Sequence, residues 1–173
     1  MPLRMKILLT GAGGYIGSLM GPYLKSRGHE VVGLDTGFFN EADLYPREPI
    51  QMVAKDTRIV TVEDLEGFGA VVHLAELSND PLGNLNRQST FKINHLGTTR
   101  LAKLSKEAGV PRFIHSSSCS VYGMGEMGEV KDEFSNPIPL TAYAECKVLV
   151  EEEVSKMADE KFSPTFSRNA TVY

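Results

Sequence analysis

The chain has 173 residues, which corresponds to one domain on a prior of roughly 100–200 residues per domain. Hydrophobic residues make up 42% and charged residues 23%, a composition typical of a folded globular protein and not of a disordered chain. The formal net charge of −4 argues against a nucleic-acid partner, because such partners require a basic face. No apolar run approaches the roughly 18 residues that a membrane-spanning helix needs, so no membrane partner is expected.

The cysteines and the N-terminus indicate the compartment. Cys119 and Cys146 have neither the spacing of metal ligands nor that of a disulfide framework, and the histidines are scattered, so no metal site is predicted. The apolar stretch Met5–Thr10 is too short for the core of a secretory signal, and glycines follow it instead of a cleavage site. We interpret it as a first strand and expect a cytoplasmic protein with reduced thiols.

Short apolar, β-branched runs alternate with longer helical patterns along the chain. The predicted strands are Met5–Thr10, Glu30–Asp35, Ile50–Ala54, Ala70–Ala75, Arg112–Ser117 and Ser163–Ala170. The predicted helices are Tyr15–Arg27, Thr90–Ala108 and Thr141–Met157. Runs without polar alternation, such as Val31-Val32 and Val71-Val72, indicate strands covered on both faces, as in parallel sheets. The alternation predicts an α/β fold built from βαβ units.

Three connections are longer than usual, and long loops in compact α/β proteins tend to be functional. They are Thr36–Pro49, Glu76–Asn86 and Gly123–Leu140.

A glycine-rich segment, Thr10–Gly17, directly follows the first predicted strand and opens the first predicted helix. Its glycines at 11, 14 and 17 allow a tight turn and a close approach of the backbone to a pyrophosphate at the helix N-terminus. Asp35 ends the second strand, 18 residues after Gly17 (35 − 17 = 18), where an acid can bind an adenosine ribose. Because Asp35 would repel a 2′-phosphate, the pattern favours NAD over NADP; the plain alternative is a glycine turn with a surface aspartate.

A phenol and an ammonium lie four residues apart in Tyr143-Ala144-Glu145-Cys146-Lys147, on one face of the last predicted helix. Proximity to Lys147 would lower the pKa of the Tyr143 phenol and make it a usable acid or base near neutral pH. By itself, the pair fits equally a surface Tyr/Lys contact on an amphipathic helix.

The serine-rich run Ser116–Gly123 follows the fifth predicted strand at its carboxyl end, where ligands bind in open α/β sheets. A serine hydroxyl there could share a hydrogen bond with a substrate oxygen. The plain alternative is a polar exit from the strand.

These three motifs occur in order, each at its expected place, and together they resemble the extended short-chain dehydrogenase/reductase family, in its NAD-dependent sugar-nucleotide epimerase/dehydratase branch. The resemblance covers essentially the whole chain and implies a doubly wound parallel sheet, an NAD(P)-binding Rossmann fold forming one three-layer domain over residues 1–173. The matching stretches are Thr10–Gly17, Asp35, Lys55–Thr57, His73–Ala75, Asn94–Thr98, Ser116–Gly123, Tyr143–Lys147 and Ser167–Tyr173.

The resemblance also implies roles for individual residues. Tyr143 would be the general base, Lys147 would hold the nicotinamide ribose, and Ser118 would bind the reacting sugar hydroxyl. The cofactor-binding residues implied are Gly11, Gly14, Tyr15, Ile16, Gly17, Asp35, Asp56, Thr57, Leu74, Ala75, Asn94 and Lys147. The expected partners are NAD and a nucleotide-sugar, with a possible homodimer through the helices near 90–108 and 141–157.

The chain departs from the family in two respects. Cys119 and Ser120 stand where the family's 4,6-dehydratases carry an acidic pair, and its decarboxylases a glutamate at the second position, so both reactions are disfavoured. Members are usually nearly twice as long, and their C-terminal half supplies most of the sugar-nucleotide pocket, so we expect that region to be missing. The leading prediction is an epimerase or its cofactor-binding half; the alternatives are a non-catalytic NAD(H)-binding module or a related reductase or dehydratase.

Overall fold

The computed structural model describes residues 4–41, 48–78, 80–125 and 128–172. Parts of the three long predicted connections (42–47, 79 and 126–127) lie outside the described residues. Six strands form one parallel sheet in the order β3-β2-β1-β4-β5-β6. The strands are β1 (Lys6–Thr10), β2 (Glu30–Asp35), β3 (Gln51–Ala54), β4 (Ala70–His73), β5 (Arg112–Ser118) and β6 (Ser163–Asn169).

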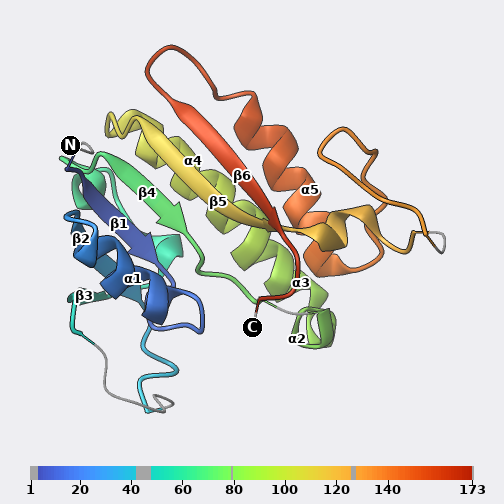
Figure 1. The fold of residues 1–173 in the computed structure, drawn as a ribbon, viewed down its shortest axis with the longest axis horizontal. Coiled ribbons are helices and arrows are strands. Elements are labelled where there is room, and N and C mark those ends of the chain that lie inside the picture. Colours follow the sequence, from blue (N-terminus) through green and yellow to red (C-terminus); the bar gives the residue numbers. More distant parts are fainter. Residues whose placement is uncertain (1–3, 42–47, 79, 126–127, 173) are drawn as a thin grey trace.

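Helices cover both faces of this sheet, which confirms the predicted doubly wound Rossmann-type fold. The helices are α1 (Gly17–Ser26), α2 (Asp80–Leu85), α3 (Arg87–Thr90), α4 (Thr98–Glu107) and α5 (Ala142–Ser155). Short helical segments are η1 (Thr57–Ile59), η2 (Glu63–Leu65), the π-helical η3 (Phe91–Gly97) and η4 (Cys119–Tyr122). Figure 1 shows α4 and α5 behind the sheet and α1 on the opposite face, near β1 and β2.

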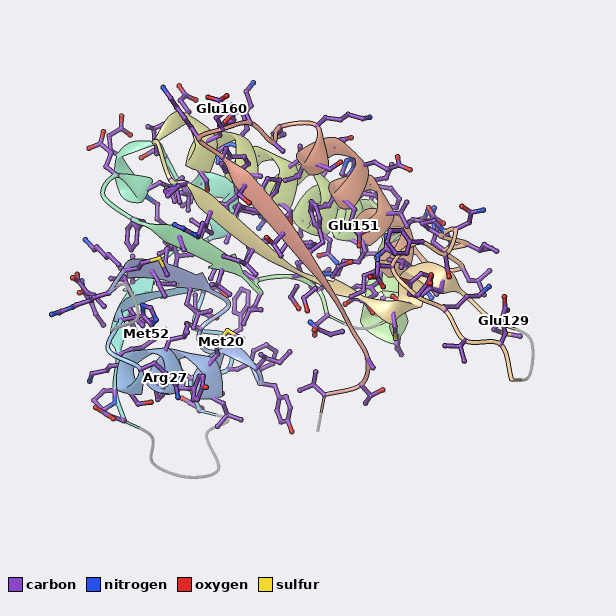
Figure 2. All side chains as sticks on the ribbon, turned by 45° about the horizontal axis from the view of Figure 1, so that its top comes forward. Met20, Arg27, Met52, Glu129, Glu151 and Glu160 are labelled. Carbon is purple, nitrogen blue, oxygen red and sulfur yellow. The ribbon has the colours of Figure 1, made fainter. Side chains whose placement is uncertain are left out.

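Two hydrophobic clusters fill the space between the layers. The larger cluster joins the sheet to α4 and α5 and includes Leu8, Leu101, Phe113 and Val150. The smaller cluster lies under α1, where Leu9 packs near Met20 and Leu24. Because successive strand residues point to opposite faces, the neighbours Leu8 and Leu9 belong to different clusters. Figure 2 shows Met20 of α1 and Met52 of β3 near one end of the sheet and Glu151 of α5 near the other.

Only the central strands of the sheet are buried on both faces. Ile7, Leu9 and Val71 of β1 and β4 are at most 3% exposed, as their unbroken apolar runs predict. All four residues of β3 are exposed, and β6 alternates between exposed and half-buried positions. These two are the edge strands, each with a neighbouring strand on one side only. No helix among the described residues is both long and apolar enough to cross a membrane.

Candidate functional site at the carboxyl edge of the sheet

The glycine-rich turn joins β1 to α1 at the carboxyl edge of the sheet. Gly11 has a φ of +72°, and a Cβ there would lie 2.7 Å from the backbone nitrogen of Ala75. A Cβ on Gly17 would lie 2.1 Å from the carbonyl oxygen of Gly11, so only glycine lets α1 start this close to the turn. The Gly14 N–H donates to the same carbonyl at 3.0 Å. The predicted glycines therefore form one compact turn.

Asp35, at the end of β2, lies directly against this turn. Its Oδ2 accepts the Gly13 N–H at 3.0 Å and its Oδ1 accepts the Gly37 N–H at 2.8 Å. A Cβ on Gly13 would stand 3.1 Å from the Asp35 carboxyl carbon, so the turn and the acid are in close contact. Each carboxylate oxygen can accept two hydrogen bonds, so both keep capacity for ribose hydroxyls. The donors and acceptors present here fit the adenosine half of a dinucleotide.

The predicted groove-lining residues surround the turn. Tyr15 is 67% exposed and Ile16 is half-buried at the start of α1. Leu74 and Ala75 continue from β4, and the Leu74 N–H donates to the Thr10 carbonyl at 3.1 Å. All of them therefore lie at the carboxyl edge, next to the glycine turn.

Three other predicted cofactor residues are engaged within the protein. Asp56 caps η1 and binds the Arg58 guanidinium, and this contact lowers the pKa of the Asp56 carboxyl. Thr57 is buried. Asn94 is fully buried, and its amide both donates to and accepts from the backbone of Leu77 at 2.9 Å. The polar groups of Asp56 and Asn94 hold the segments that follow β3 and β4. A direct role of the three residues in cofactor binding stays a prediction.

Asn94 lies in the π-helical segment η3, a conformation that occurs frequently at functional sites. The amphipathic pattern of the sequence gives no signal for this local widening of the helix.

Tyr143 and Lys147 lie on the buried side of α5, which packs against β5 and η4. The Lys147 ammonium is 5.2 Å from the centre of the Tyr143 ring. Lys147 is only 3% exposed, and its Nζ donates to the carbonyl oxygen of Ser116 at the end of β5 and to the carboxylate of Glu76. The surface Tyr/Lys alternative is therefore wrong, because the lysine is buried between α5 and the strand ends.

Glu76 is the residue that sequence reasoning missed. Its side chain is 3% exposed, and it lies three residues after the end of β4, behind Leu74 and Ala75. Burial raises the pKa of the Glu76 carboxyl, and the ammonium of Lys147 opposes this shift. The Thr98 hydroxyl donates to Oε1 of Glu76 at 3.3 Å. The only signal in the sequence is an acid placed immediately after the predicted strand Ala70–Ala75.

Two buried histidines, one from β4 and one from β5, lie near Glu76 and Lys147. The ring nitrogens of His73 are 2.6 Å from the Thr10 hydroxyl and 2.8 Å from the Thr98 hydroxyl. His115 stacks on His73 at 5.7 Å between ring centres. Burial lowers the pKa of His73 to about 3 and that of His115 well below its usual range, with the charge of Lys147 adding to both shifts. Both imidazoles are therefore neutral at physiological pH.

The serine-rich run leaves β5 at the same edge. Ser118 caps η4, and its hydroxyl accepts the Ser120 N–H at 3.1 Å. It is half-buried, as is Tyr143. Ser116 and Ser117 are tied to other elements: the Ser116 hydroxyl accepts from Asn169 at 2.9 Å, and the Ser117 hydroxyl donates to Glu151. Of the three, Ser118 is the one whose hydroxyl bonds within its own segment, to a residue two positions further along the chain.

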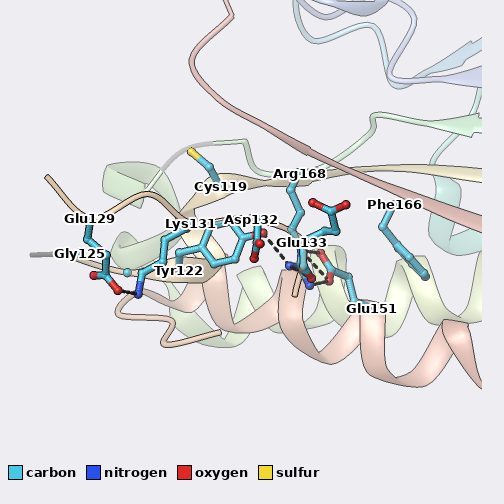
Figure 3. A pocket seen from close by; sticks show the side chains of 11 residues that line it. Cys119, Tyr122, Gly125, Glu129, Lys131, Asp132, Glu133, Glu151, Phe166 and Arg168 are labelled. Atoms are coloured by element: carbon cyan, nitrogen blue, oxygen red, sulfur yellow. Dashed lines mark hydrogen bonds and ion pairs between the residues drawn. The ribbon is translucent and has the colours of Figure 1, made fainter. Parts of the chain in front are cut away.

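A pocket of about 720 Å³ lies between η4, β6 and the connection that follows η4 (Figure 3). Arg168 of β6 is one of its lining residues, and its guanidinium binds Glu151 and the Tyr122 hydroxyl. None of its lining residues is a predicted catalytic or cofactor residue. It is therefore separate from the turn, Asp35 and the Tyr143–Lys147 pair.

A parallel sheet in this order, with a glycine turn and an acid at its switch point, is the arrangement typical of dinucleotide-binding α/β proteins. The chain belongs to the NAD dependent epimerase/dehydratase family, whose model matches residues 7–173.

Similar proteins include more than one reaction type. UDP-glucose 4-epimerase of Bacillus subtilis is 30% identical, covering 95% of this chain and 52% of its own. UDP-glucuronic acid decarboxylase 1 of Xenopus tropicalis is 31% identical, covering 86% of this chain and 36% of its own. The structure of UDP-glucuronic acid 4-epimerase from Bacillus cereus in complex with NAD has a TM-score of 0.81 and 29% identity, covering 98% of this chain and 57% of its own. The chain spans about half the length of these three relatives, or less.

Proposed function

We propose that residues 1–173 form the NAD-binding domain of a sugar-nucleotide epimerase. The observation that carries this proposal is the burial of Lys147 between α5 and the end of β5, with Tyr143 on the same helix face. A protein that only held a dinucleotide would need the glycine turn and Asp35 but not this buried pair. The non-catalytic alternative is therefore less well supported.

In this proposal each residue of the chain has a distinct task. The glycine turn binds the pyrophosphate, because it places backbone N–H groups at the start of α1. Asp35 binds the adenosine ribose through its carboxylate oxygens. Lys147 holds the nicotinamide ribose, using the donor that its contacts with Glu76 and Ser116 leave over.

Tyr143 takes the proton of the reacting sugar hydroxyl, and Ser118 orients that hydroxyl. When bound, NAD supplies the hydride acceptor at the sugar carbon. The ammonium of Lys147 lies 5.2 Å from the centre of the Tyr143 ring, so the proposed base and the proposed ribose-binding group are neighbours. Cys119 and Ser120, in η4, offer no acidic pair for water elimination, so epimerisation is favoured over dehydration.

The cofactor test is a titration of the protein with NADH, followed by nicotinamide fluorescence, with NADPH in parallel. We expect saturable binding that prefers NADH, because Asp35 repels a 2′-phosphate. Asp35→Asn is expected to reduce that preference while the fold is retained. Absence of binding to either dinucleotide would contradict the proposed cofactor site.

The catalytic test uses Tyr143→Phe, which removes only the phenolic oxygen. We expect this variant to bind NADH like the parent and to lose turnover of nucleotide-sugars. Loss of both binding and turnover would contradict the role proposed for Tyr143. A parent protein that binds NADH but converts no nucleotide-sugar would favour the binding-module alternative.

The proposed homodimer is tested separately. Helices α4 and α5 pack side by side on one face of the sheet, where a second copy would add its own pair (Figure 1). Light scattering over a range of concentrations should detect the dimer. A strict monomer at high concentration would refute it.

A further inference from the structure

Lys147 is the centre of a buried polar cluster formed by residues from four parts of the chain. Glu76 comes from the segment after β4, His73 from β4 itself, His115 from β5, and Thr98 from the start of α4. The side chains of Glu76 and Lys147 are each 3% exposed, and both histidines are at most 1% exposed. A buried ion pair of this kind is retained only with close partners, because an unpaired charge is costly in the interior.

Metal binding does not explain the cluster. Ligand atoms of His73, Glu76 and His115 lie within 4.8 Å of one another. However, both nitrogens of His73 are within hydrogen-bonding distance of threonine hydroxyls, and the Lys147 ammonium already contacts the Glu76 carboxylate. A cation placed there would be repelled by the ammonium at close range. Oε1 of Glu76 also lies 3.7 Å from Nε2 of His115, but that imidazole is neutral, so the charged group beside Glu76 is Lys147.

Among the described residues, Glu76 is the acidic side chain in direct contact with Lys147. His73 and His115 are neutral, since burial and Lys147 lower the pKa of both. The thiol of Cys146, next to Lys147 on α5, is also neutral, because burial raises its pKa to about 12. On the neighbouring surface, Glu145 and Arg87 form a pair with each other. The ammonium of Lys147 is thus offset by one carboxylate, that of Glu76.

This balance matters for a nicotinamide cofactor because its two forms differ in charge. The oxidised ring is a cation, whereas the reduced ring is neutral. An ammonium without a counter-ion beside the nicotinamide ribose would disfavour the oxidised form, while a neutral ion pair would not. The exposed surface of the protein cannot provide this compensation, since water screens charges there.

We propose that Glu76 is a specificity-determining residue for the redox state of the cofactor. It cancels the charge of Lys147 and so allows the site to bind the oxidised dinucleotide. This inference rests on the proposed function, since it requires Lys147 to contact the nicotinamide ribose. It goes beyond that function because it proposes that Glu76 sets the ratio between the affinity for NAD⁺ and the affinity for NADH.

The test is isothermal titration of the protein and of Glu76→Gln with NAD⁺, NADH and AMP. Glutamine has nearly the same shape as glutamate and keeps an oxygen acceptor for Lys147, so the substitution removes mainly charge. Glu152→Gln, at an exposed position of the same α5 as Lys147, is the matched control for the loss of one negative charge. AMP reports on the adenosine half alone.

We expect Glu76→Gln to raise the ratio Kd(NAD⁺)/Kd(NADH) about tenfold. The Kd of AMP should not change, and Glu152→Gln should behave as the parent. The double variant Glu76→Gln/Lys147→Met, which lacks both charges, should return the ratio to within about twofold of the parent. If Glu76→Gln does not fold, Glu76→Ala carries the same test, since it removes the charge and leaves room for a water to solvate the ammonium.

Equal weakening of NAD⁺ and NADH in Glu76→Gln, with an unchanged ratio, would overturn the proposal and leave Glu76 a purely structural role. A parent protein that binds AMP but neither dinucleotide would overturn it together with the proposed function. The two failures are therefore distinguishable.

Discussion

Replacing His115 by Phe should remove part of the acid sensitivity of the fold. His115 is fully buried, and its ring lies between the ring of His73 and the edge of Phe166. Among the described residues, neither of its ring nitrogens has a hydrogen-bond partner. Phenylalanine keeps an aromatic ring in this position and has no group that takes up a proton.

The expected magnitude follows from the pKa values. In the unfolded chain a histidine titrates at about 6.5, whereas burial holds the pKa of His73 at about 3 and that of His115 well below 6.5. As pH falls below 6.5, the unfolded chain therefore binds protons that the folded protein does not. At pH 5.0, about 1.5 pH units lower, this difference costs about 2 kcal/mol of stability for His73 and at most about 2 kcal/mol for His115.

Glu76 acts in the opposite direction. Burial raises its folded pKa, so its protonation in the folded state adds stability as pH falls through that pKa. The informative quantity is therefore the difference between the variant and the parent, and not the total acid loss of either protein.

The assay is urea unfolding, followed by circular dichroism, at pH 7.5 and at pH 5.0. Between these values, His115→Phe is expected to lose less stability than the parent, by up to about 2 kcal/mol. His29→Gln is the control; it should lose as much as the parent, because both buried histidines remain. An equal loss in His115→Phe and the parent would refute the conclusion that His115 is buried in its neutral form.

Two further substitutions test the packing around the site. Gly17→Ala should cost about 2 kcal/mol or more and abolish NADH binding, since its Cβ would lie 2.1 Å from a carbonyl oxygen. Gly69→Ala, where the nearest atom is 3.5 Å away, should keep NADH binding, as thermal unfolding and fluorescence titration would show. Arg168→Ala should cost about 2–3 kcal/mol in urea unfolding, because it leaves Glu151, 12% exposed, without its guanidinium partner. Arg58→Ala, whose side chain is 48% exposed, should cost less than about 1 kcal/mol, and equal losses in the two arginine variants would contradict the difference in burial.

Local patterns in the sequence were sufficient to predict the strands of the sheet. The predicted strand Glu30–Asp35 has the same bounds as β2, and the other predicted strands differ from the observed ones by two residues or fewer at each end. The predicted helix Thr141–Met157 corresponds to α5, and the Thr141 hydroxyl caps it by accepting the Ala144 N–H at 3.2 Å. Apolar periodicity and caps involve residues close in the chain, so the sequence alone carries this information.

The region between β4 and α4 was predicted less well. The segment Glu76–Asn86 was expected to be a loop, but it contains α2. The expected single helix Thr90–Ala108 consists of the end of α3, the π-helical segment η3 and α4. Here the buried amide of Asn94 binds the backbone of Leu77, which lies 17 residues away in the chain. A contact over that separation has no local signal.

The sequence by itself determined the order of elements, the glycine turn with Asp35, and the spacing of Tyr143 and Lys147. Only the tertiary structure decided what Lys147 contacts, because Glu76 lies 71 residues away in the chain and meets it where the segment after β4 reaches α5. The same holds for His73 and His115, whose pKa values depend on burial between layers. Periodicity reports which face of an element is apolar, whereas the partner of a buried charge is decided by which elements become neighbours in the folded sheet.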